Sequence, residues 1–207
     1  MLSIVANGQF PRTLFPRHIL DTSDHVICCD GALSLLEKHG IAPDVVIGDL
    51  DSVCRRALAR FNGTVVKDED QQTNDLSKAV HYAVGHFPQE TEMHILAATG
   101  RSEAHTIGNA SLLMEFAKSY PHLKIDMISD YSTIFAITDS DTLHIGAGRR
   151  ISIFSPDPTL RIKSKGLRWK TDNVVFDNWW KASLNIADDD AVRLDFNHKS
   201  TALIILD

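Results

Sequence analysis

The feature that most constrains the fold of this 207-residue chain is a change of pattern about two-thirds of the way along it. Before residue 131, short runs of consecutive apolar residues alternate with stretches in which apolar residues recur at helical spacing. After it, only short strand-like runs remain, separated by Gly, Pro, Asp and Asn. Alternating strands and helices favour an α/β sheet, whereas strands alone favour an antiparallel sandwich or barrel. The sequence therefore predicts two domains of different class.

The strand-like runs of the first part are apolar throughout, which is typical of parallel strands buried on both faces. They are residues 2–6, 26–29, 45–47, 64–66, 93–97 and 125–128. Helices are predicted between them, where apolar residues recur every three or four positions. These helices are residues 32–39, 76–87 and 107–117. We expect a mainly parallel sheet with right-handed crossovers.

The second part carries only strand signals. They fall at residues 132–138, 142–145, 150–155, 160–164, 174–176, 192–196 and 202–206. The turn residues between them predict an antiparallel sandwich or barrel. The predicted domains are residues 1–134, an α/β domain, and residues 135–207, an all-β domain. No low-complexity linker separates them, so we expect the two to pack closely.

Composition excludes several classes of function. The formal net charge of -6 argues against a nucleic-acid or membrane-surface partner, because both select for basic patches. No apolar run approaches the ~20 residues that span a bilayer, and the first residues lack the basic region and long apolar run that are typical of a signal peptide. We therefore expect a cytoplasmic protein. Cys28, Cys29 and Cys54 form no Cys-x-x-Cys motif, which argues against zinc. The adjacent pair is expected to fill a buried strand.

An acidic pair follows the third predicted strand. Asp49 and Asp51 lie two residues apart, so in extended backbone their side chains point the same way. In an open parallel sheet, ligands bind beyond the carboxyl ends of the strands. Neighbouring carboxylates repel unless a cation lies between them, and such oxygen ligands suit magnesium. The alternative is that Asp51 and Ser52 cap a helix running through Leu58.

A second polar segment, residues 68–78, opens the helix predicted at 76–87. Thr73 or Asn74 can cap that helix. Asp75 and Lys78 lie one turn apart and share a face, so the carboxylate can add a metal ligand and the lysine can reach a phosphate. The alternative is a solvated acidic turn with ordinary capping.

Three further turns are of the kind that can approach a nucleotide. The turn at residues 98–109 contains Gly100 and Arg101, which can offer backbone N–H groups and a guanidinium to phosphate. Asn7-Gly8 and Asp30-Gly31 follow the first and second predicted strands. Taken singly, each of these two is an ordinary tight turn.

The tryptophans of the second part are its most conspicuous residues. Trp179 and Trp180 are followed closely by Ser183 and Asn185, and Trp169 precedes them. An aromatic ring beside small polar side chains suits a flat heteroaromatic or cationic ligand. The alternative for each tryptophan is a place in the sandwich core or in a dimer interface.

Together these segments resemble the thiamine pyrophosphokinase family, in the family's order and over nearly the whole chain. The matching motifs are Asp30-Gly-Ala32, Pro43-Asp44, Gly48-Asp-Leu-Asp-Ser52, Asp70-Gln71, Thr73-Asn-Asp-Leu-Ser-Lys78, Ala98-Thr-Gly100 with His105, Gly166-Leu-Arg-Trp169 and Ser183-Leu-Asn185. The most specific is the Gly-Asp-Leu-Asp-Ser block followed by Thr-Asn-Asp-Leu-x-Lys.

The resemblance implies an α/β domain, a β-sandwich and a homodimer with sites between subunits. It also implies transfer of pyrophosphate from ATP to the hydroxyl of thiamine, giving thiamine diphosphate and AMP. It assigns catalysis and Mg²⁺ binding to Asp49, Asp51 and Asp75. The implied nucleotide-binding residues are Asn7, Asp30, Gly31, Thr73, Lys78, Thr99, Gly100, Arg101 and His105. The implied thiamine-binding residues are Gln71, Trp169, Trp180, Ser183 and Asn185.

One turn departs from the family pattern. The family's Gly-x-Arg-x-Asp-His places Ser102 at the arginine position and Ala104 at the aspartate position. Arg101 and Glu103 lie one residue earlier, which on a helix is a rotation of ~100°. A fourth carboxylate is thus expected but missing at Ala104. Two alternatives follow: a homologue that binds thiamine or nucleotide without efficient turnover, and another phosphoryl or pyrophosphoryl transferase that uses the same acidic cluster.

Overall fold

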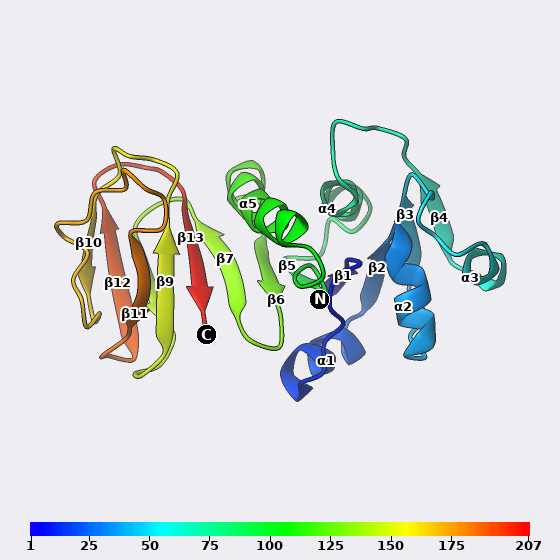
Figure 1. The fold of residues 1–207 in the computed structure, drawn as a ribbon, viewed down its shortest axis with the longest axis horizontal. Helices are drawn as coiled ribbons and strands as arrows, with labels where there is room; N and C mark the ends of the chain where they lie inside the picture. Colours follow the sequence, from blue (N-terminus) through cyan, green and yellow to red (C-terminus); the bar gives the residue numbers. More distant parts are fainter. The chain divides into compact units, whose positions relative to one another are not determined.

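The computed structural model describes residues 1–207, which divide into two compact units (Figure 1). The α/β unit comprises Met1–Leu112 and His122–Asp130, and the β unit comprises Leu113–Pro121 and Tyr131–Asp207. The expected order, an α/β part followed by an all-β part, is confirmed. The expected domain boundary between residues 134 and 135 stays a prediction.

The α/β unit is built on a six-stranded parallel sheet in the order β6-β5-β1-β2-β3-β4. Its strands are β1 (Leu2–Val5), β2 (His25–Cys29), β3 (Val45–Gly48), β4 (Thr64–Lys67), β5 (Glu92–Leu96) and β6 (Lys124–Ile128). The chain runs outward from β1 to β4 and then returns to β5, on the other side of β1. Ligands of such sheets bind beyond the carboxyl ends of the strands, where the order reverses.

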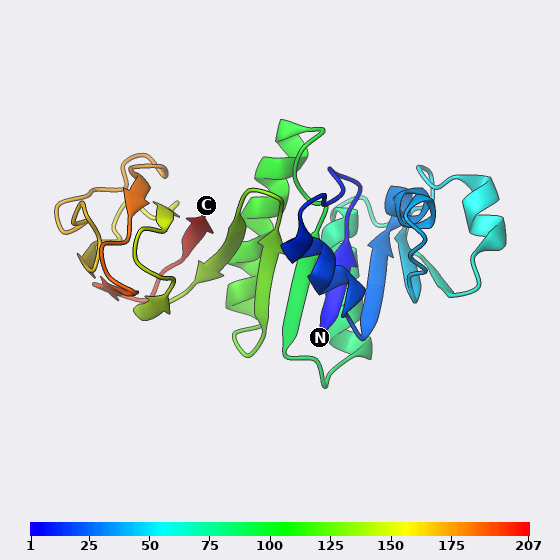
Figure 2. The same cartoon turned by 90° about the horizontal axis from the view of Figure 1, so that it is seen from below.

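Helices cover both faces of this sheet, with α1 and α2 on one face and α4 on the other (Figure 2). They are α1 (Leu14–Asp21), a 3-10 turn (Asp30–Ala32) leading into α2 (Leu33–Lys38), α3 (Arg55–Arg60), α4 (Asp75–His86) and α5 (Glu103–Ser119). The α4 cap is Asn74, whose side chain accepts a hydrogen bond from the Ser77 N–H at 2.9 Å. None of the helices is long and apolar enough to cross a membrane.

The differences from the predicted α/β elements have local causes. Helices α1 and α3 were not predicted, because they are short and bury only a few residues each. Strand β4 was predicted to be buried on both faces, and this was wrong. It is the outermost strand of the sheet, and most of its residues are exposed.

The β unit contains two antiparallel sheets, one in the order β11-β9-β13-β7 and the other β10-β12-β8. The strands are β7 (Thr133–Ile137), β8 (Asp141–His144), β9 (Arg150–Phe154), β10 (Ile162–Lys165), β11 (Ala182–Ile186), β12 (Ala191–Phe196) and β13 (Ala202–Leu206). Apolar residues from both sheets form one buried cluster, including Ile151, Ile162, Val192 and Ile204. The predicted antiparallel sandwich is confirmed.

Two strand assignments in the β unit were wrong. Residues 174–176 form a loop, and the apolar signal there comes from Phe176, which is buried in the core. Strand β11 was not predicted, because its sequence mixes polar and apolar residues. A register shift interrupts its pairing with β9, and Leu184 there has a left-handed φ of 59°.

A half-buried charge pair links two neighbouring strands of the α/β sheet, β5 and β6. His94 on β5 lies opposite Asp126 on β6, with His94 Nδ1 2.7 Å from Asp126 Oδ1. Burial opposes the charged imidazole, but the hydrogen bond to Asp126 and the charges of Asp126 and Glu92 raise the pKa of His94. A raised pKa contributes stability below the ordinary value of 6.5, and this contribution is lost as the pH rises through the folded-state pKa.

We therefore expect Asp126→Asn to lower the free energy of unfolding by about 1–3 kcal/mol at about pH 6, and by less at about pH 9. Thermal denaturation at the two pH values measures the difference. Asp177→Asn is the control, because it breaks an exposed pair with Lys181 that contains no histidine. A loss that is equal at both pH values for Asp126→Asn would contradict the assignment.

Candidate active site

Four aspartates gather at the carboxyl ends of β2 and β3, where α4 begins. Asp30 follows β2, Asp49 and Asp51 follow β3, and Asp75 opens α4. Carboxylate oxygens of Asp30, Asp49 and Asp51 all lie within 4.8 Å of one another. Gly48 lies against Asp30 and Asp75, because a Cβ added to it would stand 2.7 Å from Asp30 Cβ and 3.2 Å from Asp75 Oδ1. We call these four residues the acidic cluster.

The backbone turn after β3 brings Asp49 and Asp51 together. Gly48 has a φ of 154° and Leu50 a φ of 67°, so this segment is not the extended backbone that the sequence interpretation assumed. The carboxylates converge because the turn folds back on itself, with the Asp51 N–H donating to Asp49 Oδ1 at 3.2 Å. The alternative in which Asp51 and Ser52 cap a helix is wrong, because α3 begins at Arg55 with Cys54 at its N-cap.

Asp30 is the buried member of the acidic cluster. Its side chain is almost fully buried, with the residue 1% exposed, and its Oδ2 accepts a hydrogen bond from the Ser52 N–H at 3.2 Å. Its Oδ1 is buried without a hydrogen-bond partner. A buried carboxylate oxygen without a partner costs free energy unless a cation or a proton satisfies it. The donor set around it, three carboxylates, is of the kind that Mg²⁺ prefers.

The pKa values of the cluster follow from burial and crowding. Burial and the charges of Asp75 and Asp49 raise the pKa of Asp30, against the hydrogen bond from Ser52. Burial and the charges of Asp49, Asp51 and Asp68 also raise the pKa of Asp75, against the charge of Lys78. Hydrogen bonds from the Asp51 N–H and the Gln71 side chain lower the pKa of Asp49. Without a cation, the cluster therefore retains protons most readily at Asp30 and Asp75.

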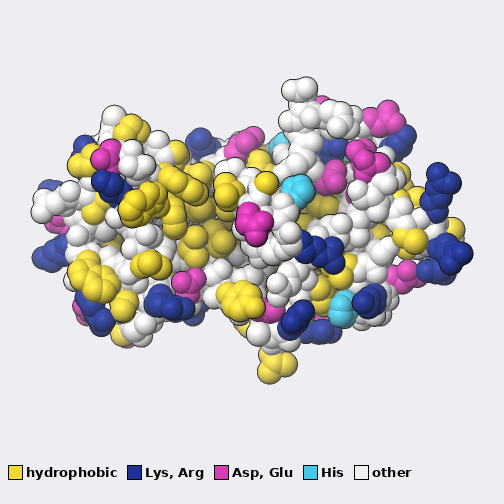
Figure 3. Space-filling view, viewed as in Figure 1, with side chains coloured by type: hydrophobic (Ala, Val, Ile, Leu, Met, Phe, Trp, Pro, Cys, Tyr) yellow, Lys and Arg dark blue, Asp and Glu magenta, His cyan; other side chains and the backbone are white.

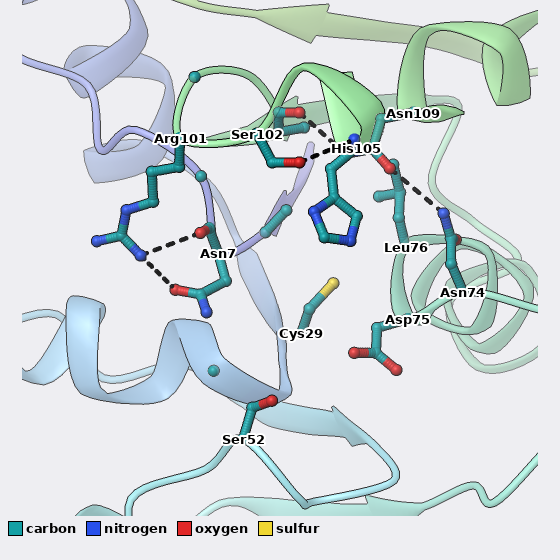
Figure 4. Close-up of a pocket in the computed structure, with 15 residues that line it drawn as sticks. Asn7, Cys29, Ser52, Asn74, Asp75, Leu76, Arg101, Ser102, His105 and Asn109 are labelled. Atoms are coloured by element: carbon teal, nitrogen blue, oxygen red, sulfur yellow. Dashed lines mark hydrogen bonds between the residues drawn. The ribbon is translucent and has the colours of Figure 1, made fainter. Parts of the chain in front are cut away.

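A pocket of about 230 Å³ opens beside the acidic cluster (Figure 4). Asp75, Ser52 and Cys29 lie on one side of it, and the His105 side chain enters from the start of α5 on the other. Further polar lining comes from the turns after β1 and β5, with Asn7, Gly8, Gly100, Arg101 and Ser102, and from Asn74 and Asn109. One aspartate, Asp75, thus lies across the pocket from backbone N–H groups and neutral or basic side chains.

Arg101 reaches this pocket although it lies one residue before the family's arginine position. Its backbone is left-handed, with a φ of 65°, and follows Gly100 with a φ of 71°. Its Nη1 donates to the Asn7 side-chain Oδ1 at 3.0 Å and to the Asn7 carbonyl at 3.2 Å. The turn thus supplies a guanidinium to the pocket wall by a local change of backbone conformation.

Ser102 and Ala104, the two departures from the family pattern, have different surroundings. Ser102 Oγ accepts a hydrogen bond from the His105 N–H at 3.3 Å, so it caps the start of α5. Ala104 and Glu103 are exposed and do not line the pocket. The carboxylate that was expected at Ala104 is therefore not replaced by Glu103, and the fourth carboxylate of the cluster is Asp30.

Several predicted nucleotide-binding residues lie near the pocket without lining it. The Lys78 side chain is 3% exposed, its Nζ donates to the Asp68 carbonyl at 2.8 Å and it lies 3.8 Å from Asp75 Oδ1. Thr73 Oγ1 donates to Asp70 Oδ2 at 2.8 Å. The Thr99 carbonyl accepts from the Gln9 N–H at 2.8 Å and so fixes the turn after β1. Phosphate contacts by these residues stay predictions.

Most of the predicted thiamine-binding residues share a shallow pocket of about 290 Å³ in the β unit. Trp169, Ser183 and Asn185 line it, whereas Trp180 does not. Asn185 is buried and holds the Trp169 backbone, donating to the Trp169 carbonyl at 2.6 Å and accepting from its N–H at 3.2 Å. The three tryptophans are 44–57% exposed, so a place in the sandwich core is wrong for each. Gln71 lies in the α/β unit, next to Asp49.

Asn109 is a pocket residue that the sequence interpretation did not identify. It is buried, donates to the Ala98 carbonyl at 2.9 Å and accepts from Asn74 at 3.3 Å (Figure 4). It therefore ties the turn after β5 to the cap of α4. It lies four residues after His105 on the same face of α5, but the predicted helix began only at residue 107, so this spacing was not recognised. The placement of Asp30 with the metal-type carboxylates was likewise not predicted, because only the fold brings β2 next to β3.

Comparison with known proteins shows which class of enzyme combines these two units. The thiamin pyrophosphokinase catalytic domain matches residues 16–125, more than half of the chain, and the thiamin pyrophosphokinase substrate-binding domain matches residues 133–204. The chain therefore belongs to the thiamin pyrophosphokinase family. The predicted enzyme class, thiamine diphosphokinase, is supported by the same two matches.

Solved structures share the fold over almost the whole chain. Thiamine pyrophosphokinase from Bacillus subtilis is 21% identical, with a TM-score of 0.77 over 99% of this chain and 97% of that one. Yeast thiamin pyrophosphokinase is 16% identical, with a TM-score of 0.84 over 99% and 85% of the two chains. Thiamin pyrophosphokinase from Candida albicans is 14% identical, with a TM-score of 0.77 over 99% and 88%. A search of curated proteins gave no match.

The acidic cluster predicts how magnesium changes stability. Because the pKa values of Asp30 and Asp75 are raised, the metal-free protein loses stability as the pH rises from 3.8 through the folded-state values. A bound cation removes this loss. We expect Mg²⁺ at about a hundred times its Kd to raise the free energy of unfolding by about 2.7 kcal/mol at neutral pH, and by less in acid.

Asp30→Asn should reduce this magnesium effect, and in the metal-free state it should leave the protein at least as stable as the wild type at neutral pH. Thermal melts with EDTA and with magnesium measure both quantities. The control is Asp21→Asn, which removes an exposed charge at the end of α1. An undiminished magnesium shift in Asp30→Asn would show that the cation binds elsewhere.

Gly48 predicts a second, steric test of the cluster. Gly48→Ala should lower the free energy of unfolding by about 1–3 kcal/mol and abolish the magnesium shift, because of the left-handed φ and the clash with Asp30. The matched control is Gly85→Ala in α4, where an added Cβ meets nothing within 4 Å. That change should stabilise by about 0.5–1 kcal/mol. Equal effects of the two substitutions would rule out a special role for Gly48.

Proposed function

We propose that this chain transfers pyrophosphate from ATP to the hydroxyl of thiamine, giving thiamine diphosphate and AMP, in a Mg²⁺-dependent reaction. The observation that carries the proposal is the buried, unpartnered Oδ1 of Asp30 within a group of three carboxylates. Its chain neighbours Gly31 and Ser52, together with Asp75, line a pocket that also contains Arg101 and His105. The two parts of the chain match the catalytic and substrate-binding domains of one family.

Asp49, Asp51 and Asp75, with Asp30, are the residues proposed to hold Mg²⁺. The donor set fits the ion, because carboxylate oxygens of Asp30, Asp49 and Asp51 converge and one oxygen of Asp30 lacks any other partner. Asp75 lies beside Gly48 at the edge of this group. When bound, the ion would neutralise charge on the phosphate oxygens of ATP. Asp49, whose pKa is lowered, would be ionised at neutral pH and ready to bind it.

The opposite wall of the pocket would bind and orient the triphosphate. The start of α5 lies at this wall, and helix N-termini favour negative charge there. Arg101 adds a guanidinium whose position is fixed by Asn7, and His105 places a second donor beside it. With the β-phosphorus held by these groups, the thiamine hydroxyl oxygen would form a bond to it in line while the bond from this phosphorus to the bridging oxygen of AMP breaks, and the hydroxyl proton would pass to solvent. The protein contributes positioning and charge stabilisation rather than a covalent intermediate.

The exposed tryptophans of the β unit support the proposed thiamine site. Trp169 lies beside Ser183 and Asn185 in a pocket that offers an aromatic face and polar edges to a flat cationic heterocycle. Trp180, outside that pocket, is 52% exposed and is equally able to stack. We further propose, from the family resemblance, that the enzyme is a homodimer and that the partner's surface completes the thiamine site.

A second candidate function is binding of the substrates with little turnover. It is suggested by the turn that contains Ser102 and Ala104. Ser102 caps a helix instead of offering a guanidinium, and Ala104 offers no carboxylate. Against it, Arg101 lines the pocket and Asp30 provides a fourth carboxylate. The two functions differ in turnover, whereas both allow binding.

The acidic cluster predicts the activity of its variants. With ATP, Mg²⁺ and thiamine, we expect AMP and thiamine diphosphate to form in equal amounts. Asp49→Asn and Asp75→Asn should each lower kcat by about a hundredfold or more, since charge stabilisation in the transition state is lost. Chromatography of the products measures the rates, with Asp21→Asn as the control. No product above background at high enzyme concentration would refute the proposal.

The turn with Ser102 and Ala104, which differs from the family pattern, predicts the effect of restoring that pattern. If the turn limits turnover, Ser102→Arg combined with Ala104→Asp should raise kcat by about tenfold or more, since the two charged groups of the family's turn are then restored. Calorimetry of ATP-analogue binding to the same proteins separates binding from turnover. Tight binding without turnover in the wild type, together with gain of activity in the double variant, would establish the second candidate function instead.

A further inference from the structure

A second cavity of the α/β unit, of about 550 Å³, is lined by basic side chains and no acidic ones. Its arginines are Arg12, Arg17 and Arg101, and the imidazole of His39 and the side chain of Gln9 complete the polar lining. We call it the basic cavity. Figure 3 shows Lys, Arg and His side chains gathered on this face of the unit, around α1 and the end of α2. The concentration of positive charge contrasts with the net charge of -6 of the whole chain.

The three guanidinium groups of the basic cavity are not used in ion pairs. The arginines that do form ion pairs are Arg60, Arg150, Arg168 and Arg193. The loop that carries Arg12, between β1 and α1, is held by Asp130. The Asp130 carboxylate accepts hydrogen bonds from the backbone N–H groups of Arg12 and Thr13 and from the Thr13 hydroxyl. Asp130 holds the loop in place but does not line the cavity.

The aromatic groups of the basic cavity are already stacked on one another. Phe10 and His39 lie parallel, with ring centroids 3.9 Å apart, and the Arg17 guanidinium lies 5.6 Å from the Phe10 ring centroid. Phe10 is buried and has no free face for a planar base. The stacking therefore fixes Arg17 and His39 rather than providing a nucleobase site. Arg17 is held by Phe10 and Arg101 by Asn7, whereas the exposed Arg12 lies in the field of Asp130 without an ion pair to it. Guanidinium groups that form no ion pair are suited to phosphate, which they bind through paired N–H donors.

We propose that the basic cavity is a second anion site, distinct from the acidic cluster, that binds a small phosphate-bearing molecule. Arg101 lines both the basic cavity and the active-site pocket. An anion in the basic cavity thus shares one guanidinium with the proposed nucleotide site. The same chemistry fits two sources, a free pyrophosphate or phosphomonoester and the phosphate chain of a nucleotide that enters from the neighbouring pocket.

The test is calorimetric titration of inorganic pyrophosphate into the full-length protein in EDTA. Without a divalent cation, the acidic cluster repels the anion, so only the basic cavity is expected to bind it. We expect one site per chain and an affinity that falls as salt is added. Arg12→Gln with Arg17→Gln should weaken binding by about tenfold or more, because each loses a charge-assisted contact. Arg12→Gln alone, at an exposed position, should weaken it without affecting the packing on Phe10.

The matched control is Arg150→Gln with Arg193→Gln, which removes the same charge from ion-paired positions of the β unit. It should leave pyrophosphate binding unchanged. Absence of binding at millimolar pyrophosphate, or an equal loss in the control, would overturn the proposal, as would binding that requires magnesium. The assay contains no thiamine and follows no turnover, so its result is independent of the proposed reaction.

A second titration, with a non-hydrolysable ATP analogue and magnesium already bound, distinguishes the sources. If pyrophosphate still binds with the same stoichiometry, the basic cavity takes a separate phosphate-bearing ligand. If the analogue prevents binding, and the Arg12→Gln with Arg17→Gln variant binds the analogue more weakly, the cavity takes part of the nucleotide's phosphate chain. Both results support an anion site at these arginines, and only the occupant differs.

Discussion

Repulsion among the carboxylates around Gly48 is the interaction on which the rest of the site depends. Asp30 and Asp75 are placed on either side of a glycine that leaves no room for a side chain, and Asp49 and Asp51 complete the group. The parallel sheet forces this arrangement, because the ends of β2 and β3 meet at one edge and α4 begins beside them. The raised pKa values of Asp30 and Asp75 record the unfavourable free energy of holding the group without a cation.

The second wall of the pocket is organised around a single side chain, Asn7. Its Oδ1 accepts from Arg101, and its amide lies against Gly31, where a Cβ would stand 2.3 Å from Nδ2. Gly31 directly follows Asp30, so the position of the guanidinium and the position of the buried carboxylate are set by one short chain of contacts. Contacts thus run without a break from Arg101 through Asn7 to Gly31, the residue next to Asp30.

The sequence predicted the fold class because its periodicities are set by burial. The apolar runs of β1, β2 and β5 and the helical repeat of α4 each describe one packed surface. The errors lie where an apolar pattern does not correspond to a buried strand or helix. Strand β4 is apolar yet lies at an exposed edge, residues 174–176 are apolar because one aromatic fills the core from a loop, and β11 is interrupted by a residue with left-handed φ.

The candidate site divides in the same way. Asp49, Asp51 and Asp75 were recognisable because they follow local signals, a strand end and a helix cap. The place of Asp30 in the acidic cluster was not predicted, because it depends on which strands are neighbours. The place of Asn109 in the pocket was not predicted, because it depends on a contact between α5 and the cap of α4. The reach of Arg101 into the pocket depends on a left-handed residue next to Gly100, which no residue count along a regular helix can anticipate.

The cysteines show a further consequence of how the α/β unit is packed. Burial raises the pKa of Cys28 to about 12 and that of Cys29 well above its ordinary value, although Cys29 lines the pocket. Cys54 is exposed, and the N–H groups of Ala57 and Arg56 lower its pKa. Since thiolates rather than thiols react with alkylating reagents, the native chain offers one labelling position, three residues beyond Asp51. A fluorophore attached there would report on the turn that carries the carboxylates, with no residue of the protein replaced.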